Sequence, residues 1–379
     1  MHLKELHIHA FRNLQQCSLR DLGQFNFIHG RNGSGKTSVL EAIHMLSLTR
    51  SFRSRQVASV VNFDAPALMV RAQLAEAAGQ DTRSLGIQRG RDKSLLLKYD
   101  GERLRSFNDL AGLLPVQLIN PDSFLLFEGG PAERRQFLDW SVFHVKHLGF
   151  YGEWTRYRKA LKQRNTLLRR GKLADALLSP WEGEIAQTGA KITAMRRAQF
   201  ERIADGFADI VKQIQRDIGA DAAALSQQHF TMRFHSGWDD AEGELGADAL
   251  RAALVGSREQ DGRQGFTRLG PHRADIRFLC GGVNASDVLS RGQIKTLVCA
   301  LKLAQCRLMR EQGLDVVLLV DDLPAELDRE RRRALFSLIS TMGIQLFATS
   351  IAEDDLDDSW CGASGCVTRF HVEHLAVGG

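Results

Sequence analysis

The residues that could do chemistry begin with a glycine-rich stretch, GRNGSGKT, at positions 30–37. Its spacing, G-x-x-x-x-G-K-[ST], is typical of a loop that binds phosphate groups. The glycines let the backbone curl so that N–H groups point at one phosphate, the lysine reaches the neighbouring phosphates, and the threonine hydroxyl can bind Mg²⁺. We therefore expect the phosphates of ATP to be held by Gly30, Arg31, Asn32, Gly33, Ser34, Gly35, Lys36 and Thr37.

The residues on either side of this loop predict the elements that it needs. Phe25, Phe27 and Ile28 indicate a strand before the loop, and the apolar pattern from Ser38 to about Ser47 indicates a helix after it. A strand, a glycine loop and a helix in this order favour nucleotide binding over a chance glycine turn.

Two carboxylates follow a second apolar run. Residues 316–320, VVLLV, form a continuous apolar stretch, which is typical of a parallel strand buried on both faces. We expect Asp321, which follows this run, to bind Mg²⁺ through the water shell of the ion, with Thr37 as a second metal ligand. Asp322 would face the attacking water and act as general base, and the alternative is that it caps the following turn.

A third stretch, LSRGQIKT at 289–296, opens a helix, because Ile294, Leu297, Val298 and Leu301 recur at helical spacing. The free N–H groups and the dipole at the start of a helix attract an anion. This helix start, the phosphate loop and the Asp-Asp strand end together resemble the ABC class of ATPases, whose signature is LSGGQ-like.

The resemblance to the ABC class implies a second copy of the chain. In that class the signature caps the γ-phosphate that a partner holds, so two ATP molecules are enclosed in a head-to-tail homodimer. The signature residues would be Ser290, Arg291, Gly292 and Gln293, and Glu326 and Asp328 stand where the class has its D-loop.

Several longer stretches resemble the RecF family, which is related to the ATPase heads of SMC proteins. The most specific of them are TRSFRS at 49–54 and PAERRQFLD at 131–139. The family motifs follow one another in the family order along the whole chain, within residues 30–54, 121–140, 270–276, 289–305 and 318–328.

This resemblance implies a protein that binds ATP and Mg²⁺, dimerises when ATP is bound, and binds single-stranded DNA, gapped DNA and duplex junctions. It implies joint work with RecR and RecO in placing RecA on DNA, in replication, recombinational repair and the SOS response. Hydrolysis of ATP would be weak, stimulated by DNA, and used as a switch.

Some residues leave alternatives open. The family commonly has glutamine at the position of Arg291, so this cation would either strengthen ATP-dependent pairing or face DNA. Thr349 and Ser350 stand where ABC transporters carry a switch histidine, and without an imidazole we expect turnover below about one per second. His272 and Arg273 either line the nucleotide site or fix the turn into the next strand.

Basic residues predict where DNA would lie. Residues 156–172 contain eight basic residues and no acidic one. Contacts to phosphate need only positive charge density, although most charged runs are solvated helix faces. The DNA-binding candidates are Arg164, Arg169, Arg170 and Arg53.

The patterns along the chain predict an α/β fold, in which an ABC-type ATPase head is built from both chain ends and a mainly helical second domain is inserted between them. Helical spacing runs from Pro131 to about Asp217, and loops with one or two short helices are expected over 219–265. We assign residues 1–130 and 266–379 to the head and residues 131–265 to a helical arm.

Composition excludes some classes of protein. The net charge of +5 is too small to indicate a nucleic-acid binder by itself. The six cysteines contain no C-x-x-C pair, which favours a reducing cytoplasm over a disulfide framework or a zinc site. The charged N-terminus is not a signal peptide, and the apolar runs are too short to span a membrane.

Two other functions are compatible with the nucleotide motifs. One is the nucleotide-binding subunit of a membrane transporter or another ABC-type assembly, and the other is an ATP sensor that recruits partners without hydrolysis. The helical insertion and the missing switch histidine argue against the transporter subunit.

Overall fold

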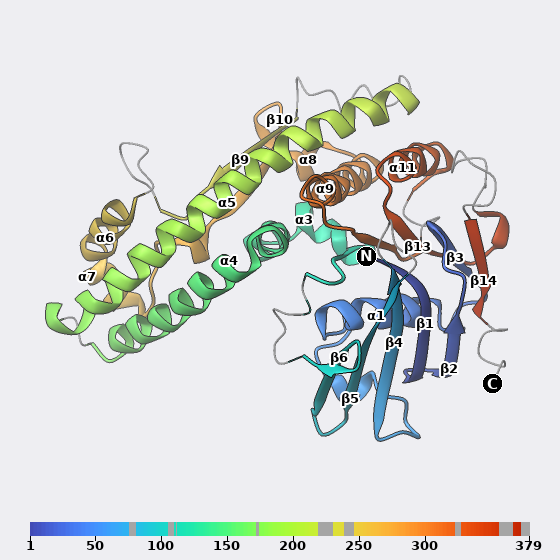
Figure 1. Cartoon of the computed structure of the whole chain (residues 1–379). Coiled ribbons are helices and arrows are strands. Elements are labelled where there is room, and N and C mark those ends of the chain that lie inside the picture. The colour runs from blue at the N-terminus through green and yellow to red at the C-terminus, as the bar shows by residue number, and fades with distance from the viewer. Residues whose placement is uncertain are drawn as a thin grey trace. The chain divides into compact units, whose positions relative to one another are not determined.

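The computed structural model describes residues 1–75, 81–104, 110, 112–171, 174–218, 230–238, 246–322, 327–355 and 367–372 (Figure 1). These residues form two compact units. The first unit contains residues 1–124, 209–223 and 291–379, and the second contains residues 125–208 and 224–290. Both ends of the chain therefore contribute to the first unit, as the sequence predicts for the head.

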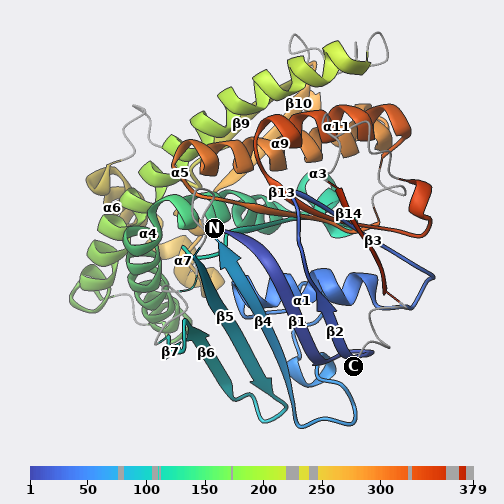
Figure 2. The same cartoon turned by 45° about the vertical axis from the view of Figure 1, so that its right-hand side comes forward.

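The first unit contains an antiparallel six-stranded sheet with the strand order β2-β1-β4-β5-β6-β7 (Figure 2). Apolar and polar residues alternate along its strands, for example around Leu6 and Ile8 in β1, so that one face is buried. This face packs against α1 in a core that includes Val39 and Leu40. The bounds are His2–Phe11 for β1, Leu14–Leu19 for β2, Ala67–Ala75 for β4, Thr82–Gly90 for β5, Leu95–Tyr99 for β6, Glu102–Arg103 for β7 and Lys36–Leu48 for α1.

A second sheet in the same unit is parallel and has the strand order β14-β3-β13-β12-β8. Parallel strands place their carboxyl ends at one edge, which is where α/β proteins bind ligands. This edge brings together the ends of β3, β12 and β13. The bounds are Phe25–His29 for β3, Val116–Ile119 for β8, Val317–Val320 for β12, Gln345–Ser350 for β13 and Val367–His371 for β14.

Helices α9 (Arg291–Glu311) and α11 (Arg329–Thr341) also belong to the first unit. The apolar face of α9 is buried, and the helix contacts β8. The ring of Phe336 in α11 lies 5.9 Å from Phe25 and 5.6 Å from Phe27, measured between ring centroids. These contacts fix β3, the strand that leads into the phosphate loop.

The second unit is dominated by two long helices, α4 (Pro131–Arg169) and α5 (Asp175–Ile218), of which the last residues of α5 belong to the first unit. Ion pairs from Arg156 to Glu184 and from Lys191 to Glu153 join the helices side by side and antiparallel. The other elements are α3 Leu125–Glu128, β9 Phe230–His235, α6 Ala247–Gly256, α7 Arg258–Gln264, β10 Asp275–Cys280, β11 Val283–Asn284 and α8 Ala285–Val288.

The division differs from the sequence assignment at three places. Residues 125–130, assigned to the head, lie in the second unit, and residues 209–223, assigned to the arm, belong to the first. Residues 266–290, which the sequence assigned to the head, lie in the second unit because β10 pairs with β9 and with β11 in a three-stranded sheet. The α/β class, the head made from both chain ends and the helical insertion are as predicted. In the part of the chain that the structure describes, no helix is long and apolar enough to cross a membrane.

Candidate nucleotide-binding site

The phosphate loop lies between β3 and α1 and is covered by the turn between β1 and β2. Gly35 has φ +113°, and a Cβ there would lie 2.6 Å from the side chain of Leu14, so this position requires glycine. The side chain of Asn13 donates to the carbonyl of Gly33 at 3.0 Å and accepts from the hydroxyl of Ser38 at 3.0 Å. Asn13 thereby holds the loop against α1, a contact that the sequence pattern did not reveal.

Two side chains of the loop suit an anionic ligand. The ammonium group of Lys36 donates to the carbonyls of Gly30 at 2.6 Å and Arg31 at 2.9 Å, so it lies along the curled loop. The hydroxyl of Ser34 is buried and has no hydrogen-bond partner among the described residues. A buried hydroxyl without a partner is costly, and a phosphate oxygen would satisfy it.

The two predicted metal ligands are in contact. The hydroxyl of Thr37 donates to Oδ1 of Asp321 at 3.0 Å, and the hydroxyl of Thr349 donates to the same oxygen at 2.9 Å. Burial raises the pKa of Asp321, and the two hydrogen bonds and Arg53 oppose this rise. Hydroxyl and carboxylate oxygens are the ligands that Mg²⁺ prefers, and a desolvated carboxylate favours a cation beside it. These residues therefore fit a magnesium ion that also binds nucleotide phosphates.

Asp322 is exposed at the same sheet edge, where its carboxylate is accessible. It has φ +53°, a left-handed conformation that is uncommon for residues other than glycine. Its backbone N–H donates to the hydroxyl of Thr349 at 2.8 Å. The N-cap of α11 is Asp328, which accepts from the N–H of Arg331 at 2.9 Å, whereas Glu326 lies outside the described residues.

A buried carboxylate links two loops beside the phosphate loop. Glu41 in α1 is 0% exposed, accepts from Nη2 of Arg12 at 2.7 Å, and also accepts from the hydroxyl of Ser51. The oxygen of Ser51 accepts in turn from the N–H of Arg53 at 2.9 Å. The main chain of Arg53, a DNA candidate, is therefore connected through Ser51 to Glu41 in α1, the helix that follows the phosphate loop.

The signature residues lie where the sequence predicts a helix start. Helix α9 begins at Arg291, with Gly292 and Gln293 in its first turn and Ser290 directly before it. Ser290 and Arg291 are exposed, so a partner could reach them. Their role across a dimer stays a prediction.

The structure corrects one DNA candidate. Arg164 is 0% exposed, and its guanidinium group donates to Asp261 at 2.7 Å, to Glu182 at 3.2 Å and to the carbonyl of Leu254 at 3.0 Å. These contacts hold α4, α5 and α7 together, so Arg164 does not present its charge to solvent. Arg169 and Arg170, at the end of α4, are exposed.

His272 fixes a turn in the second unit. Its Nε2 donates to the carbonyl of Thr267 at 2.9 Å, so its Nδ1 accepts from the hydroxyl of Tyr157 at 2.6 Å. Burial lowers the pKa of His272 to about 4, so the ring is neutral at pH 7. Of the two alternatives left open by the sequence, the contacts of His272 favour the turn into β10.

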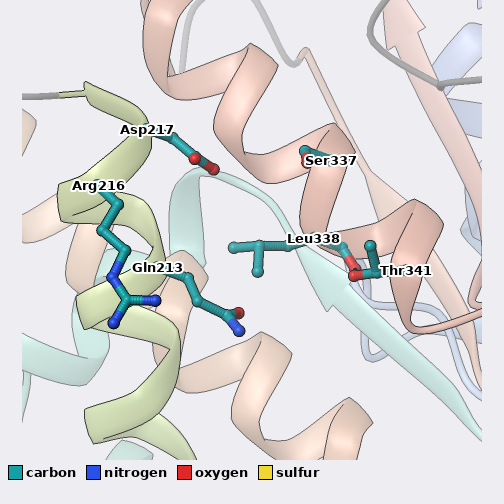
Figure 3. A pocket seen from close by; sticks show the side chains of 6 residues that line it. All are labelled: Gln213, Arg216, Asp217, Ser337, Leu338 and Thr341. Atoms are coloured by element: carbon teal, nitrogen blue, oxygen red, sulfur yellow. The ribbon is translucent and has the colours of Figure 1, made fainter.

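One pocket of about 230 Å³ lies in the first unit between the end of α5 and α11 (Figure 3). Gln213 and Leu338 extend toward each other from the two helices, and Asp217 points toward Ser337. No residue of the phosphate loop lines this pocket. It is therefore separate from the nucleotide site.

Comparisons with known proteins agree with this geometry. Residues 2–366 match the family model described as RecF/RecN/SMC N terminal domain. The DNA replication and repair protein RecF of Stutzerimonas stutzeri is 41% identical over 375 residues, which are 99% of this chain and 96% of that protein. The protein of the same name from Pseudomonas fluorescens is 42% identical over 374 residues, which are 98% of this chain and 97% of that protein.

Solved structures show the same fold. A structure of the recombination mediator protein RecF-ATPrS in the RecFOR pathway has a TM-score of 0.82 at 26% identity, and covers 98% of this chain and 96% of that one. An Smc head domain of Pyrococcus furiosus, at 14% identity and a TM-score of 0.53, covers 93% of this chain and 90% of that one, and shares the fold. With full-length relatives above 40% identity, this chain belongs to the RecF family.

Proposed function

We propose that this chain is an ATP-switched, DNA-binding protein of recombinational repair. It binds ATP and Mg²⁺, forms a homodimer in the ATP state, and engages single-stranded DNA, gapped DNA and duplex junctions in the cytoplasm. It acts with RecR and RecO and, through them, helps to place RecA in repair and SOS induction. The observation that carries the proposal is the phosphate loop joined through Thr37 to Asp321, in a chain whose full-length relatives are RecF proteins.

The residues of the site divide the work of ATP hydrolysis. The loop N–H groups, Lys36 and Ser34 bind the phosphates, and Thr37 and Asp321 are the oxygen ligands for the metal. A bound magnesium ion would supply positive charge to the β- and γ-phosphates. Asp322 is the group that accepts the proton of the attacking water, because it is the exposed carboxylate next to Asp321.

The signature would complete the site of a second copy. Ser290, Gly292 and Gln293 would bring the N–H groups of the helix start to the γ-phosphate of the partner, where Arg291 adds a positive charge. Two sites of this kind would be filled at once in a symmetric pair. ATP binding would therefore stabilise the homodimer.

The main test is Asp322→Asn. Because the amide cannot accept the proton, we expect the hydrolysis rate to fall by about 100-fold or more, while the affinity for ATP stays within about threefold. Hydrolysis is measured as phosphate release with and without gapped DNA, and ATP binding by titration. The exposed carboxylate Asp287, changed to Asn, is the matched control and should behave as the wild type.

The outcomes separate the candidate functions. A wild type that binds ATP and dimerises without turnover would be an ATP sensor. A wild type that binds ATP but neither dimerises nor binds DNA would contradict the proposed ATP-switched DNA binding. An Asp322→Asn variant with unchanged turnover would remove Asp322 as the base.

The DNA contact is tested with Arg169→Ala/Arg170→Ala. Because both side chains are exposed, we expect weaker DNA binding and a salt dependence, d log K/d log[salt], that is less steep by about two for duplex DNA. Binding is measured by fluorescence anisotropy over a range of salt. The control, Arg251→Ala/Arg263→Ala, removes equal charge from α6 and α7, and an unchanged slope in the first variant would remove this surface from the DNA contact.

A further inference from the structure

Thr349 touches both carboxylates of the site. It is the last but one residue of β13, which pairs in parallel with β12, so it follows the pair Val320 and Ala348 and lies opposite Asp321. It is 1% exposed. Its hydroxyl is 2.9 Å from Oδ1 of Asp321 and 2.8 Å from the backbone nitrogen of Asp322.

The direction of both hydrogen bonds is fixed by chemistry. A backbone N–H can only donate, so the oxygen of Thr349 accepts from Asp322. The hydroxyl has one proton, and an ionised carboxylate can only accept, so that proton points to Asp321. A single hydroxyl therefore orients the side chain of one aspartate and the main chain of the next.

Each of these contacts bears on the chemistry. Oδ1 of Asp321 accepts hydrogen bonds from the hydroxyls of Thr37 and Thr349, which belong to different elements, so the carboxylate is held from two directions. A hydroxyl has two lone pairs, so Thr37 can keep its bond to Asp321 while its oxygen binds a metal. The hydrogen bond from the N–H of Asp322 to Thr349 stabilises the left-handed conformation of Asp322. This conformation determines the direction in which the side chain of Asp322 leaves the main chain.

We propose that Thr349 is a positioning residue for ATP hydrolysis, which orients Asp321 toward the metal and Asp322 toward the attacking water. This inference rests on the proposed function. Thr349 is one of the two residues, with Ser350, that stand where ABC transporters carry a switch histidine, and its hydroxyl is engaged with the two aspartates. It acts on the aspartates from the sheet side, through hydrogen bonds to carboxylate and backbone.

The test compares side chains that keep or remove the hydroxyl. Thr349→Val preserves the shape and removes the hydroxyl, whereas Thr349→Ser keeps the hydroxyl. Two quantities are measured in the full-length protein: the Mg²⁺ concentration that gives half-maximal binding of a fluorescent ATP analogue, and kcat and KM for ATP. Thr341→Val is the matched control, because its hydroxyl donates to the carbonyl of Leu338 within its own helix.

We expect Thr349→Val to need about tenfold more Mg²⁺ and to lose about tenfold or more in kcat, with KM for ATP little changed. Thr349→Ser and Thr341→Val should stay within about threefold of the wild type. If the valine variant does not fold, as judged by circular dichroism and melting without nucleotide, Thr349→Ser and Thr349→Ala replace the pair, since they differ by one hydroxyl.

The outcomes distinguish a failure of the role of Thr349 from a failure of the proposed function. A wild type that binds the analogue with Mg²⁺, and a valine variant equal to it in both measurements, would overturn the role of Thr349 alone. A serine variant as impaired as the valine variant would also overturn it, because the hydroxyl would then not matter. A wild type whose ATP binding is weak and independent of Mg²⁺ would overturn the proposed function and this inference together.

Discussion

Replacing Lys36 by methionine is expected to weaken ATP binding about 100-fold or more, which corresponds to the loss of charge-assisted hydrogen bonds to two phosphates. Methionine has a similar length and no charge, so the change removes the ammonium group with little change of volume. Binding is measured by titration with ATP and Mg²⁺, and a thermal melt without nucleotide checks the fold. The melting temperature is compared with that of the wild type, because the ammonium group also donates to the loop carbonyls of Gly30 and Arg31.

The control for this experiment is Lys98→Met, which removes an exposed ammonium group from β6 and should leave ATP binding unchanged. A Lys36→Met variant that binds ATP as tightly as the wild type would contradict the assignment of the loop. A variant that melts far below the wild type would instead show that the ammonium group is needed for the loop itself.

Asp261→Ala should destabilise the second unit by about 3–5 kcal/mol, which is the usual cost of removing one partner from a buried ion pair. Asp261 is 0% exposed and accepts from Arg164 at 2.7 Å, from Ser257 at 2.9 Å and from Arg268 at 3.2 Å. Among the described residues, alanine would leave Glu182 as the one acid paired with the buried guanidinium group of Arg164, and Glu182 already accepts from Arg258 at 2.6 Å.

Urea unfolding followed by tryptophan fluorescence measures this change, because the second unit contains Trp140, Trp154, Trp181 and Trp238. Glu259→Ala is the control. It removes an acid from the same helix α7, but one that is 79% exposed and paired with Arg263, so it should cost less than about 1 kcal/mol. A cost below 1 kcal/mol for Asp261→Ala would mean that the buried network relaxes when one acid is lost.

The sequence predicted those elements whose signals are local. Strand β3 and helix α1 lie within two residues of the predicted bounds, and β12 lies inside the apolar run 316–320. The phosphate loop was found because its function demands a fixed spacing of glycine, lysine and threonine. The meeting of Thr37 with Asp321 could be expected too, since a loop after one strand and a residue at the end of another share the same sheet edge.

The rest depends on residues far apart in the chain. The run 156–172 contains eight basic residues, but its count of charges does not show that Arg164 is partnered by Asp261. Strand β9 was not predicted because its flanks are rich in glycine, alanine and aspartate, which are typical of loops. Its strand conformation depends on pairing with β10, which lies about 40 residues further along the chain. The hydrogen bonds from Asn13 to the phosphate loop and from Arg12 to Glu41 likewise follow no spacing rule.

Strand β3 pairs with two strands that are synthesised much later than β3 itself. Its neighbours are β13 and β14, which begin at Gln345 and Val367, so a ribosome releases the strand FNFIH long before either partner exists. Until then the newly made segment is an apolar strand with unpaired edges, the kind of surface that chaperones cover. A chain truncated before Gln345 should therefore lack the nucleotide site although its phosphate loop is intact, and ATP can stabilise this fold only after β13 and β14 have been synthesised.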